Sequence, residues 1–473
     1  MTATAVMDRT KPKTPAKQRK RLFIPSPYPL SAAIKNADVV TWSSVPVFGL
    51  GNILRGQYVK GAIFLFGQVA FIYMLFTQGL ACLAGLGELG PVTQGGQEWD
   101  ENGNFIYVNP TQSVQVLLFG IAWVLLVIAF LIWWATAFRS AYKAQVLLHD
   151  KGKVPTFVQD LKDLLDNRIH GTLMTLPTLG IFMFTILPLL FMMALAFTDF
   201  DRNHPVAFNW IGFQNFASVL SQTGSGTAGV NGGLFLRVLV WTLVWAILAT
   251  FLNFFLGMFM AMIILRKGTR LKGLWRTCFS MSIAVPQFVS LLTINQMLQG
   301  EGIVNQMLRQ WGWIETSLPF FTNAMWARAT VIIVNLWVGI PFTIMQITAI
   351  LQNIPSELYE ASKIDGASGW QTYIHITMPY IFFVATPYLI TTFTGNINNF
   401  NVIFFLSNGA PTRVGESAGQ TDLFITWLYK LTVDRHNYNV GAVIGILTFV
   451  VLATVSLITY RNSGSYKNEE GFR

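Results

Sequence analysis

Charged side chains are scarce in this chain. Asp, Glu, Lys and Arg make up 11% of the 473 residues and hydrophobic residues make up 53%, whereas soluble domains carry roughly 25% charged residues. This deficit excludes an ordinary soluble domain and favours a membrane protein. Cysteine is rare as well. Cys82 and Cys278 lie near opposite faces of the expected membrane arrangement, so we expect neither a disulfide nor a cysteine metal site.

Motifs for catalysis and energy conversion are missing too. No G-x-x-x-x-G-K-[ST] sequence occurs, and the histidines show neither H-E-x-x-H spacing nor paired cysteines. We therefore expect no enzyme activity, no metal and no cofactor on this chain; energy for any active transport would come from another polypeptide. The cluster of Asp199, Asp201 and His204 is interpreted as the start of a solvated loop rather than a metal site.

Eight apolar segments are long enough to cross a bilayer, which takes about 20 residues per helix. They cover 61–84, 114–138, 171–196, 234–264, 279–299, 326–351, 379–405 and 438–460. A further patch near 39–50 is short and Gly-rich, and we interpret it as interfacial or re-entrant in preference to a ninth span. The expected fold class is an all-α polytopic membrane protein with about 8 transmembrane helices.

The centres of these segments hold almost no ionisable side chain. Arg237 and Arg328 lie near segment ends, where long side chains can snorkel toward water. Proton-driven carriers commonly use buried ionisable groups, so their scarcity argues against such a carrier, while sodium sites built from neutral oxygens remain open.

The net charge of +10 is distributed unevenly. Basic residues precede the first span and fill the connections at 139–170 and 266–276, whereas those near 85–113 and 197–233 contain only Arg202. The positive-inside rule predicts a multi-pass protein of the cell membrane with both termini in the cytoplasm. We expect the basic arm to be a solvated tail rather than a segment that binds lipid or nucleic acid.

These features predict the organisation of the chain. A basic cytoplasmic arm with a possible interfacial segment covers 1–60, two spans with an outer loop cover 61–138, a cytoplasmic connection covers 139–170, a six-span core covers 171–460 and a cytoplasmic tail covers 461–473.

A polar insert at 355–378 interrupts the apolar core. Ser356 is the expected N-cap of a short helix with Glu360 near its start, and Asp365 and Gly366 would end that helix. A short rigid helix at a membrane surface can act as a lever when an apolar face fills a partner's groove and a carboxylate fixes its orientation.

The insert contains the motifs E-A-S-K-I-D-G-A, W-Q and I-T-M-P. Together they resemble the EAA coupling loop of binding-protein-dependent ABC importer permeases. Ser362 stands where Ala is usual, and Met378 stands where Leu is usual. The resemblance extends over about 171–460. It is most similar to the larger permease subunit of maltose/maltodextrin importers (MalF type) at 333–341, 396–400 and 406–411. The very large outer domain of the best-known relative is absent, and 1–60 is poorly covered.

The resemblance implies a type I ABC importer permease that forms half of the translocation pathway for maltose/maltodextrin-like oligosaccharides. It implies a second, MalG-like permease subunit, two ABC ATPase subunits that hold ATP and Mg, and an extracellular sugar-binding protein. The residues implied to couple to the ATPase are Glu360, Ala361, Asp365, Gly366 and Ala367.

Neutral polar residues supply a candidate sugar site. Thr392, Asn396 and Asn399 follow i, i+4, i+7 spacing and share one helical face, and a neutral polyol needs amide and hydroxyl partners with aromatic faces. Bonding to neighbouring helices is the competing interpretation. The family's sugar-contacting positions fall on Gln287, Asn335, Val338, Gly339, Phe342, Thr392, Gly395, Asn396 and Asn399. Three of them, Gln287, Phe342 and Gly395, differ from the best-known relative, so the resemblance implies the substrate class but not maltose itself.

Two other functions stay open at this point. A self-sufficient secondary sugar carrier, ion-coupled or facilitative, would need no ATPase, and the polar insert disfavours it. A non-transporting scaffold or receptor would bind partners without sugar flux, and the Asn-rich seventh span disfavours that. The 408–411 motif is interpreted as a rigid turn rather than a chemical site.

Overall fold

The computed structural model describes residues 28–93, 95–99, 105–167, 169–221, 229–266 and 268–462. The expected arm before residue 28 and nearly all of the 461–473 tail lie outside the described residues. The chain divides into two compact units. The first contains Met1–Gly85 and Phe119–Thr185, and the second contains Leu86–Leu118 and Ile186–Arg473.

Among the described residues, seven helices are long and apolar enough to cross a membrane. They are Tyr58–Gly85, Ser113–Asp150, Ile169–Leu195, Gly232–Leu265, Ala324–Gln352, Gly369–Leu406 and Tyr438–Ile458. The remaining apolar segment, expected as a span over 279–299, is a pair of helices bent by 86°. The all-α polytopic fold with about eight spans is therefore confirmed when this pair, α12 (Lys272–Ala284) and α13 (Gln287–Met297), counts as one.

The bend has a local cause at Pro286. Proline has no N–H to continue a helical ladder, and it pushes the preceding residue into an extended conformation. Val285 is accordingly extended, with φ −81° and ψ 127°. The sequence indicated a span over 279–299 but not this bend, because hydropathy measures apolar length and not straightness.

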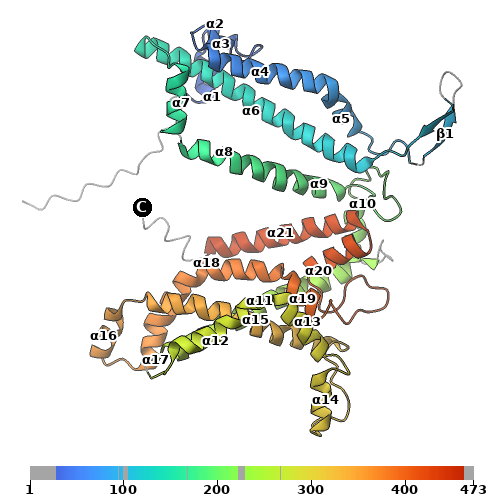
Figure 1. Ribbon diagram of the computed structural model, residues 1–473, viewed down its shortest axis with the longest axis vertical. Helices are drawn as coiled ribbons and strands as arrows, with labels where there is room; N and C mark the ends of the chain where they lie inside the picture. Colours follow the sequence, from blue (N-terminus) through green and yellow to red (C-terminus); the bar gives the residue numbers. More distant parts are fainter. Residues whose placement is uncertain are drawn as a thin grey trace, which may run out of the picture. The chain divides into compact units, whose positions relative to one another are not determined.

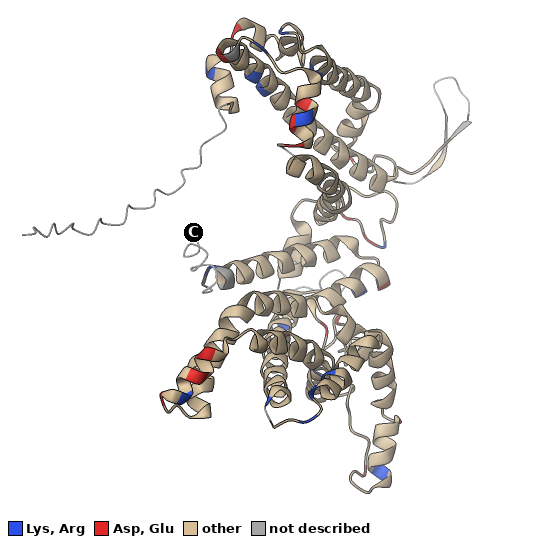
Figure 2. Ribbon diagram, turned by 60° about the vertical axis from the view of Figure 1, so that its left-hand side comes forward, with Lys and Arg blue, Asp and Glu red and all other residues tan. Residues whose placement is uncertain are grey.

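Charges are placed as the hydropathy pattern suggests. Figure 2 shows Lys, Arg, Asp and Glu at helix ends and in connections, while the long helices are almost free of them. The backbone of these helices satisfies its own hydrogen bonds, which is the condition for crossing a bilayer.

The first unit is built around two long helices, α4 and α6 (Figure 1). Its elements are α1 (Leu30–Asn36), α2 (Val39–Trp42), α3 (Leu50–Ile53), α4 (Tyr58–Met74), the π-helical turn η1 (Leu75–Gly79), α5 (Leu80–Gly85), most of α6 (Ser113–Lys151), α7 (Phe157–Leu165), α8 (Ile169–Ile181) and η2 (Phe182–Ile186). The rings of Phe71 and Phe130 stack with centroids 3.9 Å apart. Gly67 faces Trp133, where an added Cβ would lie 2.8 Å from the indole nitrogen.

The patch at 39–50 forms no helix long enough to cross a membrane; α2 and α3 have four residues each. The segment instead packs on α6: the ring centroids of Trp42 and Phe138 are 5.4 Å apart, and those of Phe48 and Phe130 are 5.1 Å apart. Arg55 forms an ion pair with Asp38. Burial opposes ionisation of Asp38, but its hydrogen bonds to Arg55 and to a backbone amide outweigh that effect and lower its pKa.

The second unit contains the remaining spans. Its elements are β1 (Gly96–Trp99), β2 (Phe105–Val108), α9 (Leu187–Leu195), α10 (Gln214–Leu220), α11 (Gly232–Leu265), α12, α13, α14 (Ile303–Gln310), α15 (Ala324–Gln352), α16 (Ser356–Ile364), α17 (Gly369–Thr372), η4 (Tyr373–Thr377), α18 (Met378–Ile397), α19 (Phe400–Leu406), α20 (Phe424–Tyr429), η5 (Lys430–Asp434) and α21 (Tyr438–Asn462). Buried side chains from α11, α15 and α18 form its central core, including Phe254, Ile344 and Ile381.

A β-hairpin occupies the first connection, where the sequence indicated only a polar loop. β1 and β2 are antiparallel, with Gly96 opposite Val108 and Trp99 opposite Phe105. The base of this connection is tied to the third one, because Asn209 accepts from the Gly90 amide at 2.9 Å.

Small side chains let α11 lie close to α15. A Cβ added to Gly257 would lie 2.6 Å from Cβ of Thr343, and one added to Gly339 would lie 2.5 Å from Nδ2 of Asn253. Membrane helices associate largely through such close packing, since lipid tails are as apolar as the side chains.

We expect Gly257→Val to destabilise the purified chain by about 1–3 kcal/mol, because the new methyl groups would push α11 from α15. Gly395→Val is the matched control, since a Cβ at Gly395 meets nothing within 4 Å. Thermal unfolding in detergent measures both. Equal unfolding temperatures for the two variants would contradict the close packing.

Candidate functional site

The insert at 355–378, which we call the coupling insert, forms α16, α17 and η4. Pro355 rather than the expected Ser356 precedes the first helical turn, and no side chain caps that end. At the other end Gly366 has φ +74°, a left-handed conformation that glycine adopts readily. The amide of Ala367 then donates to the carbonyl of Ser362 at 2.9 Å, which closes the helix.

Two side-chain hydrogen bonds hold the coupling insert together. The hydroxyls of Ser362 and Thr372 lie 3.2 Å apart, and those of Tyr359 and Thr377 lie 3.1 Å apart. Ser362 is buried, so this position, where the family resemblance leads us to expect Ala, faces inward. These two contacts tie α16 to α17 and to the end of η4.

The free face of the coupling insert is apolar and acidic. Ile364 is 87% exposed and Trp370 is 69% exposed, and Leu358 is exposed as well. Of the five expected coupling residues, Glu360, Ala361, Asp365 and Gly366 are exposed and Ala367 is half-buried. Exposed apolar groups of this size on a rigid turn indicate a protein contact.

Two of the three asparagines expected to bind sugar, Asn396 and Asn399, make hydrogen bonds to helices of the same unit. Asn396 donates from Nδ2 to the Thr250 hydroxyl at 3.0 Å, and its carbonyl accepts from the Trp245 indole at 3.0 Å. Asn399 accepts from the Val402 amide at 3.2 Å and so begins α19. The contacts of Asn396 and Asn399 agree with the helix-bonding interpretation in this conformation. Asn335 does not follow it: this residue is only 3% exposed, and its Nδ2 has no hydrogen-bond partner among the described residues.

Three other expected residues meet at one cavity. Gln287, Val338 and Phe342 line a space of about 220 Å³ at the bend between α12 and α13. Gln287 accepts from Nδ2 of Asn401 at 3.3 Å. We call this space the bend cavity.

The side chains around the bend cavity are neutral. Its other lining residues are Ser282, Ile283, Ala284, Val285, Pro286, Ser290 and Trp337. Phe342 and Trp337 are about half exposed and supply two aromatic rings to its lining. Amide, hydroxyl and aromatic groups without a fixed charge suit a neutral polyol.

Trp337 is the residue that sequence reasoning missed. It lies within the 333–341 stretch, but a tryptophan in an apolar segment carries no sign of which way it faces. Of the remaining expected residues, Gly339 packs against Asn253, and Thr392 and Gly395 do not line the bend cavity.

The loop at 407–423 is fixed by a buried carboxylate. Asp422 is fully buried, pairs with Lys430 at 2.8 Å and accepts from the Gly419 amide at 2.7 Å. Lys430 also donates to the carbonyl of Asn408 at 2.8 Å. Gly409 has φ +75° and lies against Asp422. The 408–411 motif is thus a rigid turn in this structure.

Arg237 and Arg328 hold the same loop. Arg237 pairs with Glu416, Nη1 to Oε1 at 2.8 Å. Arg328 donates to the carbonyl of Gln420 at 3.1 Å and lies 4.8 Å from the ring centroid of Trp241. These arginines, expected to snorkel, are in fact bound to protein partners at the ends of α11 and α15.

Lys430→Met leaves the buried Asp422 without its cation, and we expect a loss of about 3–5 kcal/mol in stability. Arg309→Met is the control, because its partner Glu301 is 77% exposed and such pairs contribute little. Chemical denaturation of the two purified variants provides the comparison. The structural role of Asp422 would be refuted by equal behaviour of the two.

Known proteins resemble this chain over most of its length. Residues 253–464 match the family described as binding-protein-dependent transport system inner membrane component. The chain is 33% identical over 426 residues to the galactooligosaccharides transport system permease protein GanP of Bacillus subtilis (strain 168), covering 89% of this chain and 96% of that protein. It is 30% identical over 436 residues to the maltodextrin transport system permease protein MdxF of the same organism, covering 89% and 95%.

A solved structure has the same fold. It is the crystal structure of a bacterial ABC transporter involved in the import of the acidic polysaccharide alginate, with a TM-score of 0.51 and 21% identity, covering 64% of this chain and 96% of that chain. The chain therefore belongs to the family of binding-protein-dependent transport system inner membrane components. It is a permease subunit of an ABC transporter and not its catalytic subunit, which confirms the resemblance seen in the coupling insert.

Proposed function

We propose that this chain forms half of an oligosaccharide translocation pathway in an ABC importer, within the 171–460 core and with both termini in the cytoplasm. The observation that carries the proposal is the exposed face of the coupling insert, with Ile364, Trp370 and Glu360 on one rigid turn. The names of the relatives support the substrate class, because they transport galactooligosaccharides and maltodextrin.

The coupling insert would dock into a cleft of an ABC ATPase. Ile364 and Leu358 would fill an apolar groove, and Glu360 would fix the orientation. ATP and Mg would bind to two such ATPase subunits and not to this chain. Closure of the ATPases would move α16, and the hydroxyl pairs Ser362–Thr372 and Tyr359–Thr377 would pass that movement to α18.

The proposed substrate is a neutral oligosaccharide, either a maltodextrin or a galactooligosaccharide. Gln287, Val338 and Phe342 would contact it at the bend cavity, with Trp337 as an added aromatic face. Gly395 would widen the pathway along α18, and the hydroxyl of Thr392 would contact the sugar there. The other expected positions, Asn335, Gly339, Asn396 and Asn399, would reach the sugar only after the helices rearrange.

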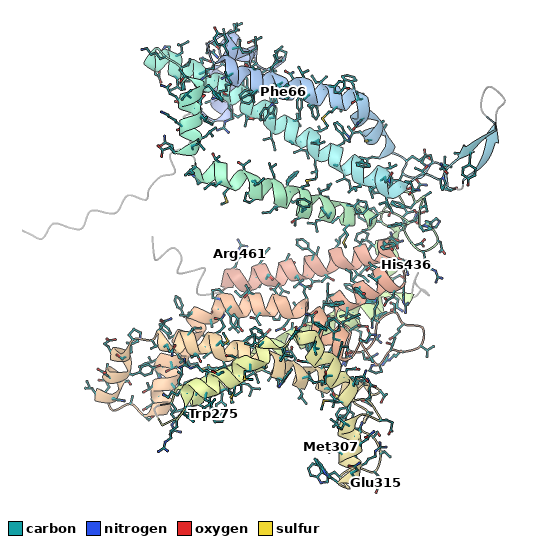
Figure 3. The ribbon with its side chains drawn as sticks, viewed as in Figure 1. Phe66, Trp275, Met307, Glu315, His436 and Arg461 are labelled. Atoms are coloured by element: carbon teal, nitrogen blue, oxygen red, sulfur yellow. The ribbon has the colours of Figure 1, made fainter. Side chains whose placement is uncertain are left out.

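Two further partners are part of the proposal. A second, MalG-like permease subunit would complete the pathway, and an extracellular sugar-binding protein would deliver the substrate. The α14 segment suits a partner on the outer side, since Met307, Trp311 and Trp313 are exposed there. Figure 3 shows Met307 and Glu315 where this segment projects from the helices of its unit.

Glu360→Arg should abolish co-purification of the ATPase from the native cell membrane while the second permease subunit is retained. Glu315→Arg is the control, because it reverses an exposed charge on the α14 side. Mass spectrometry of the tagged preparations identifies the partners. A wild-type chain that purifies alone and still transports sugar would instead favour the secondary carrier.

Trp337→Ala should lower uptake of labelled maltodextrin or galactooligosaccharide about tenfold, as expected when one good contact to the substrate is lost. Trp326→Ala is the control, since Trp326 is an exposed tryptophan on the same helix outside the bend cavity. ATPase assembly should be unchanged in both. Wild-type uptake by Trp337→Ala would remove the bend cavity from the pathway, and the better-transported sugar identifies the substrate.

A further inference from the structure

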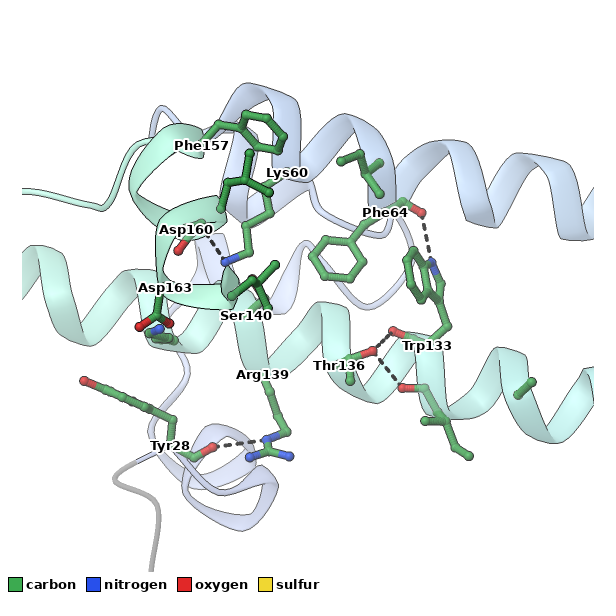
Figure 4. A pocket seen from close by; sticks show the side chains of 16 residues that line it. Tyr28, Lys60, Phe64, Trp133, Thr136, Arg139, Ser140, Phe157, Asp160 and Asp163 are labelled. Carbon is green, nitrogen blue, oxygen red and sulfur yellow. Dashed lines mark hydrogen bonds and ion pairs between the residues drawn. The ribbon is translucent and has the colours of Figure 1, made fainter. Parts of the chain in front are cut away.

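A second cavity lies within the first unit, outside the 253–464 region that matches the permease family. Helices α4, α6 and α7 surround a space of about 830 Å³, shown from close by in Figure 4. Neither the coupling insert nor the bend cavity involves this unit, so transport leaves this space without a role.

The wall that α6 provides changes from apolar to basic along the helix. Its lining residues are spaced by one, three or four positions and therefore share one face; they are Ala129, Ile132, Trp133, Thr136, Arg139, Ser140 and Lys143. The apolar members come first and the cations come last. At the apolar end Trp133 donates from its indole to the carbonyl of Phe64 at 3.4 Å, with the two ring centroids 5.1 Å apart.

Helix α4 repeats this arrangement from the opposite wall. Lys60, Ile63 and Phe64 line the cavity, and the pairing of Phe64 with Trp133 sets the two helices in register. Because α4 and α6 run in opposite directions, Lys60 lies toward the basic end and Phe64 toward the apolar end. Both walls thus offer cations at one end and hydrocarbon at the other.

The amphipathic helix α7 closes the basic end. Thr156 and Gln159 form a capping box that starts it, and Phe157, Leu161 and Leu164 line the cavity. Asp160 binds Lys60 at 3.0 Å, which holds α7 against α4. The helix is therefore placed as a fixed wall.

Cations exceed anions around the cavity. Lys60, Arg139 and Lys143 line it together with Asp160 and Asp163. Arg139 is exposed, and it donates from Nε to the carbonyl of Tyr28 at 3.2 Å. Its two terminal nitrogens make no hydrogen bond to the residues that the structure describes, so they are available to an anion.

We propose that this cavity binds an anionic phospholipid. Arg139 and Lys143 would hold the phosphate, with the hydroxyls of Thr136 and Ser140 beside it, and the acyl chains would lie along Ile132 and Phe64. A soluble anion would not use the apolar wall, and a neutral apolar ligand would not use the cations. Only an amphiphile matches both ends, and basic pockets between membrane helices on the cytoplasmic side suit anionic headgroups.

Placement in the inner leaflet depends on the proposed orientation, whereas the match of cavity to lipid does not. Trp133 lies where the lining turns from apolar to polar, which is where tryptophan is enriched in membrane proteins. The chain's own arm before residue 28 is a poorer occupant, because its seven Lys and Arg residues between Arg9 and Arg21 carry the same sign as the excess charge of the cavity.

The test uses the assembled transporter in nanodiscs that contain phosphatidylglycerol and phosphatidylcholine, followed by native mass spectrometry of the lipids that remain bound. The wild type should retain phosphatidylglycerol in preference. Arg139→Gln with Lys143→Gln should reduce its retention by about fivefold for each charge removed. Lys35→Gln is the matched control, an exposed lysine of the same unit that does not line the cavity.

A second variant keeps the charges and fills the hydrocarbon end. Ile132→Trp should also displace phosphatidylglycerol, and millimolar inorganic phosphate should not. Equal retention of both lipids by the wild type, no loss in either variant, or displacement by phosphate would each overturn the proposal. So would a several-fold gain in lipid after removal of residues 1–27, because the arm would then be the occupant. Sugar uptake is read separately, so failure here leaves the transport proposal intact.

Discussion

A bilayer offers no hydrogen-bond partners, and this constraint governs how the polar groups of the chain are arranged. Backbone groups are satisfied within helices, and several polar side chains of the spans bond to protein groups. Thr386 and Thr394 donate back to the carbonyls four residues earlier. Asn396 binds Thr250 on α11, and the charged Arg237 lies at a helix end where Glu416 neutralises it.

The same constraint makes α18 the mechanical link of the second unit. Near its beginning Thr377 is held by Tyr359 of α16, and near its end Asn396 is held by α11. Between these anchors the helix contains Pro387, which removes one backbone hydrogen bond and makes a bend easier. A rod fixed at both ends with one weaker point can change its curvature without losing either attachment.

The sequence predicted the fold well because apolar length is a one-dimensional property. Hydropathy located every span, and the coupling insert was recognisable as a polar stretch of sequence between apolar segments. The bend at Pro286 and the β-hairpin were missed. The site was predicted less completely, because a helix that is apolar on nearly all faces does not reveal its rotation. For this reason the sequence did not show that the side chain of Asn396 faces a neighbouring helix. It also did not show that Trp337 lines the bend cavity.

The 87% exposure of Ile364 has a consequence for the life of the subunit before assembly. A membrane-inserted copy without the proposed ATPase would carry two uncovered apolar side chains, Ile364 and Trp370, on the coupling insert. Chaperones and membrane proteases recognise such surfaces, and partly exposed species are continuously triaged in cells. If the coupling insert docks an ATPase as proposed, the same exposed side chain would also mark an unassembled copy for removal, which would keep the numbers of the subunits in balance.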